Sequence, residues 1–354
     1  QILQRLGRDV RNLRLFFLLC VLCHHDLVLN GGMLTTGGIC QRKNADATAD
    51  NRMFVSFDGG TIRKADATAS LFTYHGVNYT NPTHVVIHKG GATIDTNGKK
   101  NIIVNSVLEG ATGKGVKSIS FSGSWPCVAP PVVEIVDAEG SGYGAAAVVD
   151  FDAGSREIVG IRVVSPGCNY TKAVAKFYIY NSYVRPTESA IDCELADNEN
   201  TGAFTKAGEG DLALQMPNTY GGDTILAGGE LKAAVLGAIP TNSTVVFAGG
   251  KLTCTEGVSM PLNYAVDAVA AQERGAAFEY SGDLTFPDGA ILTVRRAEEL
   301  GELQKPMPLL RVSGTLGGKP EIVCPGLDAS KYKVTWHGNT LKVSPNLGML
   351  LIVR

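Results

Sequence analysis

Residues 202–234 read GAFTKAGEGDLALQMPNTYGGDTILAGGELKAA, and this stretch says most about the fold. Apolar side chains alternate at Leu212, Leu214 and Met216, which is the period of a strand with one buried face. A turn rich in Asn, Thr, Tyr and Gly follows, and a Gly-Gly pair then leads into the apolar Leu231. The stretch therefore predicts short strands separated by tight glycine turns.

A Gly-Gly pair followed by an apolar residue recurs elsewhere in the chain. The pairs are Gly31-Gly32, Gly59-Gly60, Gly90-Gly91, Gly228-Gly229 and Gly249-Gly250, and the apolar residues that follow them are Leu34, Ile62, Ile94, Leu231 and Leu252. Within each half of the chain, neighbouring pairs lie about 20 to 30 residues apart, which suits one coil of a β-helix. We expect the glycines to form the corners and the apolar residues to stack into one column.

This recurrence predicts an all-β solenoid in which successive coils share one interior. Each coil would pair its backbone with the coils on either side, at a spacing of about 4.8 Å. An antiparallel β-sandwich with glycine turns is the alternative. It explains the turns but not the recurrence of the same turn-and-strand phrase.

The stretch 202–234 also resembles the passenger-associated transport repeat of bacterial autotransporter passengers. That pattern runs Leu-Thr-Lys-x-Gly-x-Gly-x-Leu, then Asn-Thr-Tyr-x-Gly, then Gly-x-Leu, and the strong likeness is confined to this stretch. The segment 89–98 is similar to other repeats of such surface proteins. The resemblance implies a right-handed parallel β-helix and export to the cell surface.

Composition limits the function classes. The chain has 354 residues, 19% of them charged and 44% hydrophobic, so extensive disorder is not expected. Its net charge is −2 and its basic residues form no long patch, which argues against a dedicated nucleic-acid surface. The eight cysteines are too scattered for a disulfide framework and are expected to be small buried hydrophobes. A pair such as Cys127 with Cys168 stays open for an oxidising compartment.

Residues 1–26 differ from the rest of the chain, and their pattern predicts a helical leader or signal-like segment. Four arginines precede an apolar run at 15–23, as in an export signal. The alternative is a fragment end or an ordinary amphipathic helix packed on the first coil. The same segment contains Cys20-x-x-Cys23-His24, which is the spelling of covalent haem attachment. Nothing else in the sequence suggests a haem fold, and a zinc site that adds His25 is no better supported.

The remaining chain divides into four parts. We expect β-helix coils at 27–112 and again at 186–300, with the transport-like repeat at 202–234 in the second block. Between them, 113–185 reads as an inserted duplicated β module that bulges as a lobe. Residues 301–354 would cap the last coil, with a hairpin turn at Gly338-Asn339 and Trp336 as a core residue of the cap.

Two patterns place chemically active side chains close together in the sequence. His84 and His88 have the i, i+4 spacing of a zinc helix but lack the neighbouring glutamate, and alternation with Val85 and Ile87 predicts a strand with solvent-facing imidazoles. Asp150-Phe151-Asp152 places two carboxylates on one strand face. On a β-helix such acids could bind Ca²⁺ or act on a polysaccharide, whereas a solvated face is the simpler interpretation.

The sequence favours a non-enzymatic, secreted or cell-surface bacterial protein, an adhesin or structural passenger. No residue is assigned a catalytic, cofactor-binding or metal-binding role. The expected partner is a host or environmental glycan or protein surface, with no nucleic acid and no transmembrane helix in the body. The alternatives are a polysaccharide-active lyase or hydrolase that uses surface carboxylates, and haem or metal binding through Cys20, Cys23 and His24.

Overall fold

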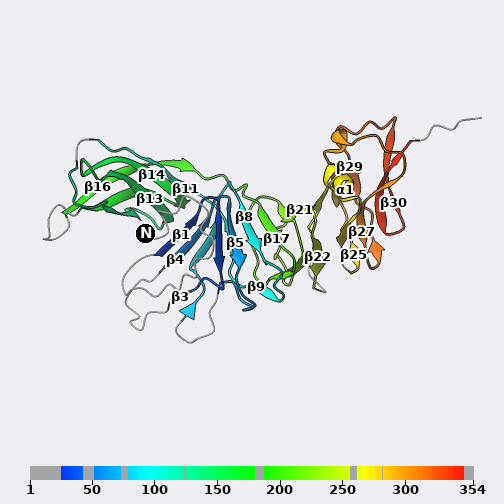
Figure 1. The fold of residues 1–354 in the computed structure, drawn as a ribbon, viewed down its shortest axis with the longest axis horizontal. Helices are drawn as coiled ribbons and strands as arrows, with labels where there is room; N and C mark the ends of the chain where they lie inside the picture. The colour runs from blue at the N-terminus through cyan, green and yellow to red at the C-terminus, as the bar shows by residue number, and fades with distance from the viewer. Residues whose placement is uncertain are drawn as a thin grey trace, which may run out of the picture. The chain divides into compact units, whose positions relative to one another are not determined.

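The computed structural model describes residues 25–42, 52–72, 79–122, 125–179, 187–255, 261–280 and 282–346 (Figure 1). Within these ranges the chain is all-β and its sheets are mostly parallel. The described part contains one α-helix, α1 (Ala268–Arg274), and one short 3-10 helix, η2 (Ala297–Glu299). The contacts divide it into two compact units. Unit 1 holds the described residues of 1–62, 72–92 and 106–202, and unit 2 holds those of 63–71, 93–105 and 203–354.

Unit 1 contains a four-stranded parallel sheet in the order β1-β4-β7-β10. Its strands are β1 (His25–Leu29), β4 (Met53–Phe57), β7 (His84–Ile87) and β10 (Leu108–Gly110). Val55 pairs with Leu27 on one side and with Val85 on the other. Every residue of β4 is buried, as expected for a central strand covered on both faces. Two short strands, β3 (Gln41–Arg42) and β6 (Tyr79–Thr80), pair antiparallel in the same unit.

The rest of unit 1 is an antiparallel lobe. One sheet has the order β11-β16-β15-β12, and β13 and β14 form a long hairpin beside it. The strands are β11 (Lys114–Ile119), β12 (Val132–Asp137), β13 (Tyr143–Asp152), β14 (Glu157–Cys168), β15 (Ala173–Ile179) and β16 (Thr187–Asp197). Phe177, Tyr170 and Ile158 belong to its apolar core.

Strand β16 belongs to this lobe, although the sequence placed residues from 186 onward in the second block of coils. Ile191 pairs with Ala175 on β15, and Leu195 pairs with Val116 on β11. The polar and apolar residues of 187–197 alternate as they would in either setting. Local pattern therefore could not say which sheet the strand joins.

Unit 2 contains two parallel sheets. The longer one includes, in order, β8 (Ala92–Asp95), β17 (Phe204–Ala207), β19 (Thr224–Leu226), β21 (Thr244–Phe247), β23 (Asn263–Asp267), β26 (Ile291–Arg295) and β29 (Glu321–Val323). The shorter one has the order β22-β20-β18-β9, with β9 (Ile102–Val104), β18 (Asp211–Leu214), β20 (Glu230–Ala233) and β22 (Lys251–Cys254). From β17 to β23, successive strands along the chain alternate between the two sheets.

The register of these sheets follows the sequence repeat. Phe204 pairs with Thr224, and Thr224 with Val245, in the longer sheet. Leu212 pairs with Leu231, and Leu231 with Leu252, in the shorter one. Leu212 also pairs with Ile102, from which it is separated by the whole lobe in sequence. The parallel stacking thus continues directly across the long insertion.

The glycine pairs form two columns, not one. Gly31, Gly59 and Gly90 lie over one another, and the Gly59 amide donates to the carbonyl of Gly91 at 2.8 Å. These turns precede β2 (Met33–Thr36), β5 (Gly60–Lys64) and β8. Gly228 and Gly250 stack in a second column, ahead of β20 and β22. The expectation of a single apolar column was wrong. The same Gly-Gly-strand motif leads into β2, β5 and β8 of one sheet and into β20 and β22 of another, so its apolar residues fall into two columns.

Unit 2 ends in a mixed sheet of order β24-β27-β31-β30. Its strands are β24 (Phe278–Tyr280), β27 (Met307–Val312), β30 (Tyr332–His337) and β31 (Thr340–Pro345), and beside it β25 (Leu284–Thr285) pairs with β28 (Leu316–Gly317). β30 and β31 form the hairpin at Gly338-Asn339 that the sequence predicts. Trp336 packs against Phe286, with ring centroids 6.1 Å apart.

Candidate functional site

The two histidines of the His84-x-x-x-His88 pattern lie in or directly after β7, as predicted, but neither imidazole simply faces solvent. The rings of His84, Phe54 and Tyr143 form a cluster: the His84 centroid lies 3.8 Å from that of Tyr143 and 5.7 Å from that of Phe54, and the last two lie 5.6 Å apart. Its Nδ1 lies 2.9 Å from a carboxylate oxygen of Glu109, and the Tyr143 hydroxyl donates to the same carboxylate at 3.0 Å. This cluster joins the parallel sheet to the lobe within unit 1, so its role is packing.

His88 is 4% exposed, so the expectation of a solvent-facing imidazole was wrong there. Burial lowers the pKa of His88, and the nearby Asp58 carboxylate opposes that shift. Among the described residues its Nε2 has no hydrogen-bond partner. His88 lines a hollow of about 150 Å³ together with Asp58, Asp197 and Glu199. In the described part of the chain, no group of three or more His, Cys, Asp or Glu side chains is placed to hold a metal ion.

The acidic pair Asp150 and Asp152 lies on the β13–β14 hairpin and does not form a shared site. Asp150 accepts hydrogen bonds from the Arg162 guanidinium at 3.0 Å. Asp152 accepts from the Gly154 amide at 2.8 Å and from the Ser155 hydroxyl at 3.0 Å, which closes its own turn. These turn bonds lower the pKa of Asp152. Both acids are therefore engaged in local structure.

The cysteine patterns lead to no site. Cys20, Cys23 and His24 lie outside the described residues. Cys127 and Cys168 are both buried free thiols, and they belong to different apolar clusters. Burial raises the pKa of Cys168 to about 11, which keeps the thiol protonated and unreactive.

The lysine of the transport-like repeat is buried and bonds to backbone. Lys206 lies on β17, and its Nζ donates to the carbonyls of Ala207, Gly208 and Gly228 at 2.9, 2.7 and 2.8 Å. Desolvation lowers the pKa of Lys206 to about 8. The residue therefore ties the turn after β17 to the turn before β20.

The Asn-Thr-Tyr motif has the same kind of role. The Asn218 side chain donates to the carbonyl of Ala238 at 2.6 Å. The Tyr220 hydroxyl lies 2.7 Å from Thr224 Oγ1, which lies 2.8 Å from Ser243 Oγ. Tyr220, Thr224 and Ser243 are fully buried. The motif thus links successive parallel segments through satisfied buried polar groups.

A more open arrangement of polar groups occurs on the outer face of the β24-β27-β31-β30 sheet. Residues directly opposite on paired strands share a face, and Glu279, Arg311, Thr340 and His337 form one such row across the four strands. A second row contains Pro308, Lys342 and Thr335, and Lys333 lies beyond it on β30. We call this surface the C-terminal polar face. The opposite face carries buried side chains such as Leu341 and Val343.

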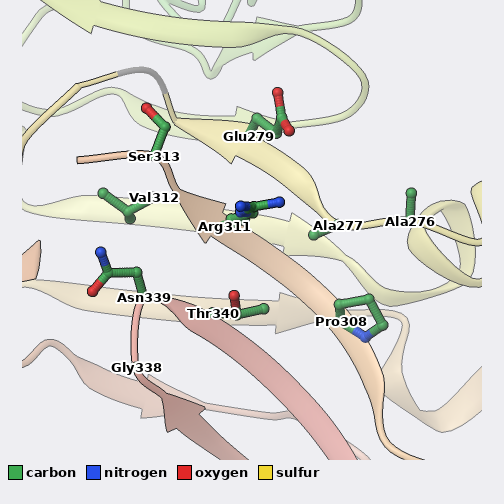
Figure 2. A pocket seen from close by; sticks show the side chains of 10 residues that line it. All are labelled: Ala276, Ala277, Glu279, Pro308, Arg311, Val312, Ser313, Gly338, Asn339 and Thr340. Atoms are coloured by element: carbon green, nitrogen blue, oxygen red, sulfur yellow. The ribbon is translucent and has the colours of Figure 1, made fainter. Parts of the chain in front are cut away.

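A groove of about 690 Å³ lies at the end of this face that carries Glu279, Arg311 and Thr340. Figure 2 shows Arg311 on β27 between Glu279 on β24 and Thr340 on β31. Ser313, Asn339 and Pro308 line the same groove. Glu279 lies 3.7 Å from the Nζ of Lys251, so part of its charge is compensated from outside the groove.

The chemistry of this groove suits binding. A guanidinium presents a planar fork of donors that matches a carboxylate, and hydroxyl and amide groups beside it suit a polyhydroxylated ligand. The predicted Gly338-Asn339 hairpin contains the strands that carry Lys333 and Lys342. The face itself could not be predicted from the sequence, because no local pattern shows that the strand with Arg311 lies beside that hairpin.

No family model, no curated protein and no solved structure matches the chain. Over the ranges that the structure describes, none of the helices has the length and hydrophobicity needed to cross a bilayer.

Proposed function

We propose that this chain is a non-enzymatic bacterial surface or secreted protein that works as a β-helical binding scaffold, in the manner of an autotransporter passenger. The observation that supports this most is the run of in-register parallel strands whose buried polar side chains bond to the backbone of the next segment. Such side chains hold a framework together and leave its outer faces free to bind. The partner is a glycan or protein surface.

The finer fold in this proposal is a right-handed parallel β-helix. In unit 2 the chain passes from β17 to β18, from β19 to β20 and from β21 to β22, each time moving from the longer sheet to the shorter one. Each strand forms a parallel pairing with the strand that follows it in the same sheet: β17 with β19 and β19 with β21 in the longer sheet, and β18 with β20 and β20 with β22 in the shorter one. One coil then contributes one strand to each sheet, and no coil has a complete core without its neighbours.

The polysaccharide-active alternative gains no support from the acids on which it depended. Asp150 pairs with Arg162 on an exposed hairpin, and Asp152 closes a turn. In most glycoside hydrolases, two carboxyl groups flank the scissile glycosidic bond. The arrangement on the β13–β14 hairpin does not provide this, so binding without cleavage is the proposed activity.

The activity test is retention without cleavage. The purified full chain is incubated with polygalacturonate, alginate and dextran, and the polymers are then assayed for retention on the immobilised protein and for chain length. We expect retention of a polymer whose length is unchanged. Shortening of a polymer, or the appearance of unsaturated ends, would overturn the non-enzymatic assignment.

The localisation test is fractionation of the bacterium that makes the protein. Antibody against the chain should detect it in the outer-membrane fraction or in the medium. Detection in the cytosolic fraction alone contradicts the surface assignment, and a cytosolic marker protein serves as the control for lysis.

A further inference from the structure

Three cations of the C-terminal polar face lie on one diagonal line. Arg311 on β27 is opposite Thr340 on β31, and Lys342 is two residues further along the same strand. Lys342 is opposite Thr335 on β30, and Lys333 is two residues further along that strand. Side chains two apart on a strand share a face, so all three cations point to the same side.

The diagonal has a regular step. Each move crosses one strand, about 4.8 Å, and advances two residues, about 7 Å, so successive Cα positions lie about 8 Å apart. Arg311 and Lys333 are exposed and Lys342 is half-buried. A single extended polyanion can therefore contact all three cations at once. This is the geometric condition under which linked contacts raise the overall binding affinity.

The surroundings of the diagonal favour a sugar polymer over a small anion. Thr340 and Thr335 lie beside the cations, and Ser313 and Asn339 line the groove at the Arg311 end of the diagonal. These groups can exchange hydrogen bonds with sugar hydroxyls, and Pro308 offers an apolar surface to a pyranose ring. Arg311 can hold a carboxylate through two parallel hydrogen bonds.

We propose that the C-terminal polar face binds an acidic polysaccharide whose carboxylates lie along the Arg311-Lys342-Lys333 diagonal. This rests on the proposed binding function and names its site and ligand class. Glu279 marks one end of the bound segment, because its carboxylate would repel a further uronate at that edge of the sheet. Binding through such exposed cations weakens as salt screens the charges.

The test compares two triple variants with equal charge changes. The face variant carries Arg311→Gln, Lys333→Gln and Lys342→Gln. The control variant carries Arg162→Gln, Lys117→Gln and Lys172→Gln, which removes three exposed cations from the lobe, whose side chains are 65%, 59% and 49% exposed. Binding of fluorescent polygalacturonate is titrated for the wild type and both variants at 50 and 300 mM salt, with neutral dextran as the uncharged probe.

We expect the face variant to lose at least tenfold in affinity and the control variant to stay within about twofold of wild type, because only the face variant removes direct contacts. Higher salt should weaken wild-type binding strongly. Equal weakening of both variants, or unchanged binding by the face variant, overturns the assigned site while the binding function stands. Failure of the wild type to retain polygalacturonate, alginate and dextran alike overturns the proposed glycan-binding function itself. Circular dichroism of both variants checks that they are folded.

Discussion

A buried lysine is unusual in a protein core, and Lys206 shows how this chain accommodates one. Its side chain is fully buried, yet its Nζ donates three hydrogen bonds, all to carbonyls at glycine-rich turns. A lysine has three donors, so the group is satisfied without a carboxylate in contact. The turns contain glycine, and their carbonyls need hydrogen-bond donors. Lys206 supplies those donors from within the same repeat.

Replacing Lys206 with methionine should destabilise the protein. Methionine keeps most of the side-chain volume but leaves three buried carbonyls without these donors, so we expect a loss of about 2–3 kcal/mol in unfolding free energy. Urea denaturation followed by circular dichroism measures it. The control is Lys117→Met, where the lysine side chain is 59% exposed and pairs with Glu194. It should change stability by no more than about 0.5 kcal/mol.

The same residue predicts a pH dependence. The pKa of Lys206 falls to about 8 in the folded chain, below the ordinary value of about 10.4, because burial disfavours the charge. Burial of the charged lysine lowers the free energy of unfolding by its full amount below pH 8, and this penalty disappears as the pH rises towards 10.4. Wild type should therefore gain stability relative to Lys206→Met between pH 8 and pH 10. A difference that stays constant over this range would contradict the buried charge.

At the scale of an element, the turn before β20 is so closely packed that steric crowding, more than backbone conformation, requires glycine. Gly229 has φ of +60° and Gly338, in the β30–β31 hairpin, has φ of +55°. A Cβ on Gly229 would lie 2.6 Å from the carbonyl oxygen of Gly208 and would also overlap that of Gly210. A Cβ on Gly338 would meet nothing within 4 Å. Both glycines have a positive φ, but only Gly229 is crowded, so comparing them distinguishes backbone strain from steric crowding.

Alanine at these two positions should give different costs. Gly338→Ala carries only the strain of a positive φ, about 1 kcal/mol. Gly229→Ala adds a clash with two carbonyls of the preceding turn, and we expect at least about 3 kcal/mol in total. Thermal and urea unfolding of both variants measure the difference. Equal losses would mean that the turns before β18 and β20 do not stack as described.

Strand β7 illustrates a different point about elements. Alternation along His84-Val-Val-Ile-His88 predicts a strand, and the strand is present. The same alternation predicts exposed imidazoles, whereas His84 stacks on Tyr143 and His88 is buried. The lobe supplies Tyr143, and residues far along the chain enclose His88. A face that is exposed in an isolated strand is thus covered by a segment from elsewhere in the chain.

At the scale of the whole molecule, the chain forms two compact units, and each contains one of its two tryptophans. Trp125 packs edge-on against Phe177 in the lobe of unit 1, with centroids 5.4 Å apart. Trp336 lies in the last sheet of unit 2. Variants with Trp125→Phe or Trp336→Phe therefore report the unfolding of one unit at a time.

We expect Leu231→Ala to destabilise unit 2 selectively. Leu231 is fully buried between Leu212 and Leu252 in the shorter parallel sheet, so the truncation should cost about 2–5 kcal/mol. The transition reported by Trp336 should shift by this amount, and the one reported by Trp125 should move much less. The matched control is Leu236→Ala in the same unit, where the leucine is 66% exposed. A shift of equal size at both tryptophans would show that the two units unfold together.

The sequence by itself determined the local elements of this protein. The glycine pairs, the apolar alternation near Leu212 and the Gly338-Asn339 hairpin follow from backbone freedom and side-chain period, which act over a few residues. Only the tertiary structure decided which strands meet: β16 joins the lobe, β9 pairs with β18 across the insertion, and β27, β31 and β30 align three cations on one diagonal. These pairings join residues far apart in the chain, and they depend on the summed burial of whole sheets, which no short pattern contains.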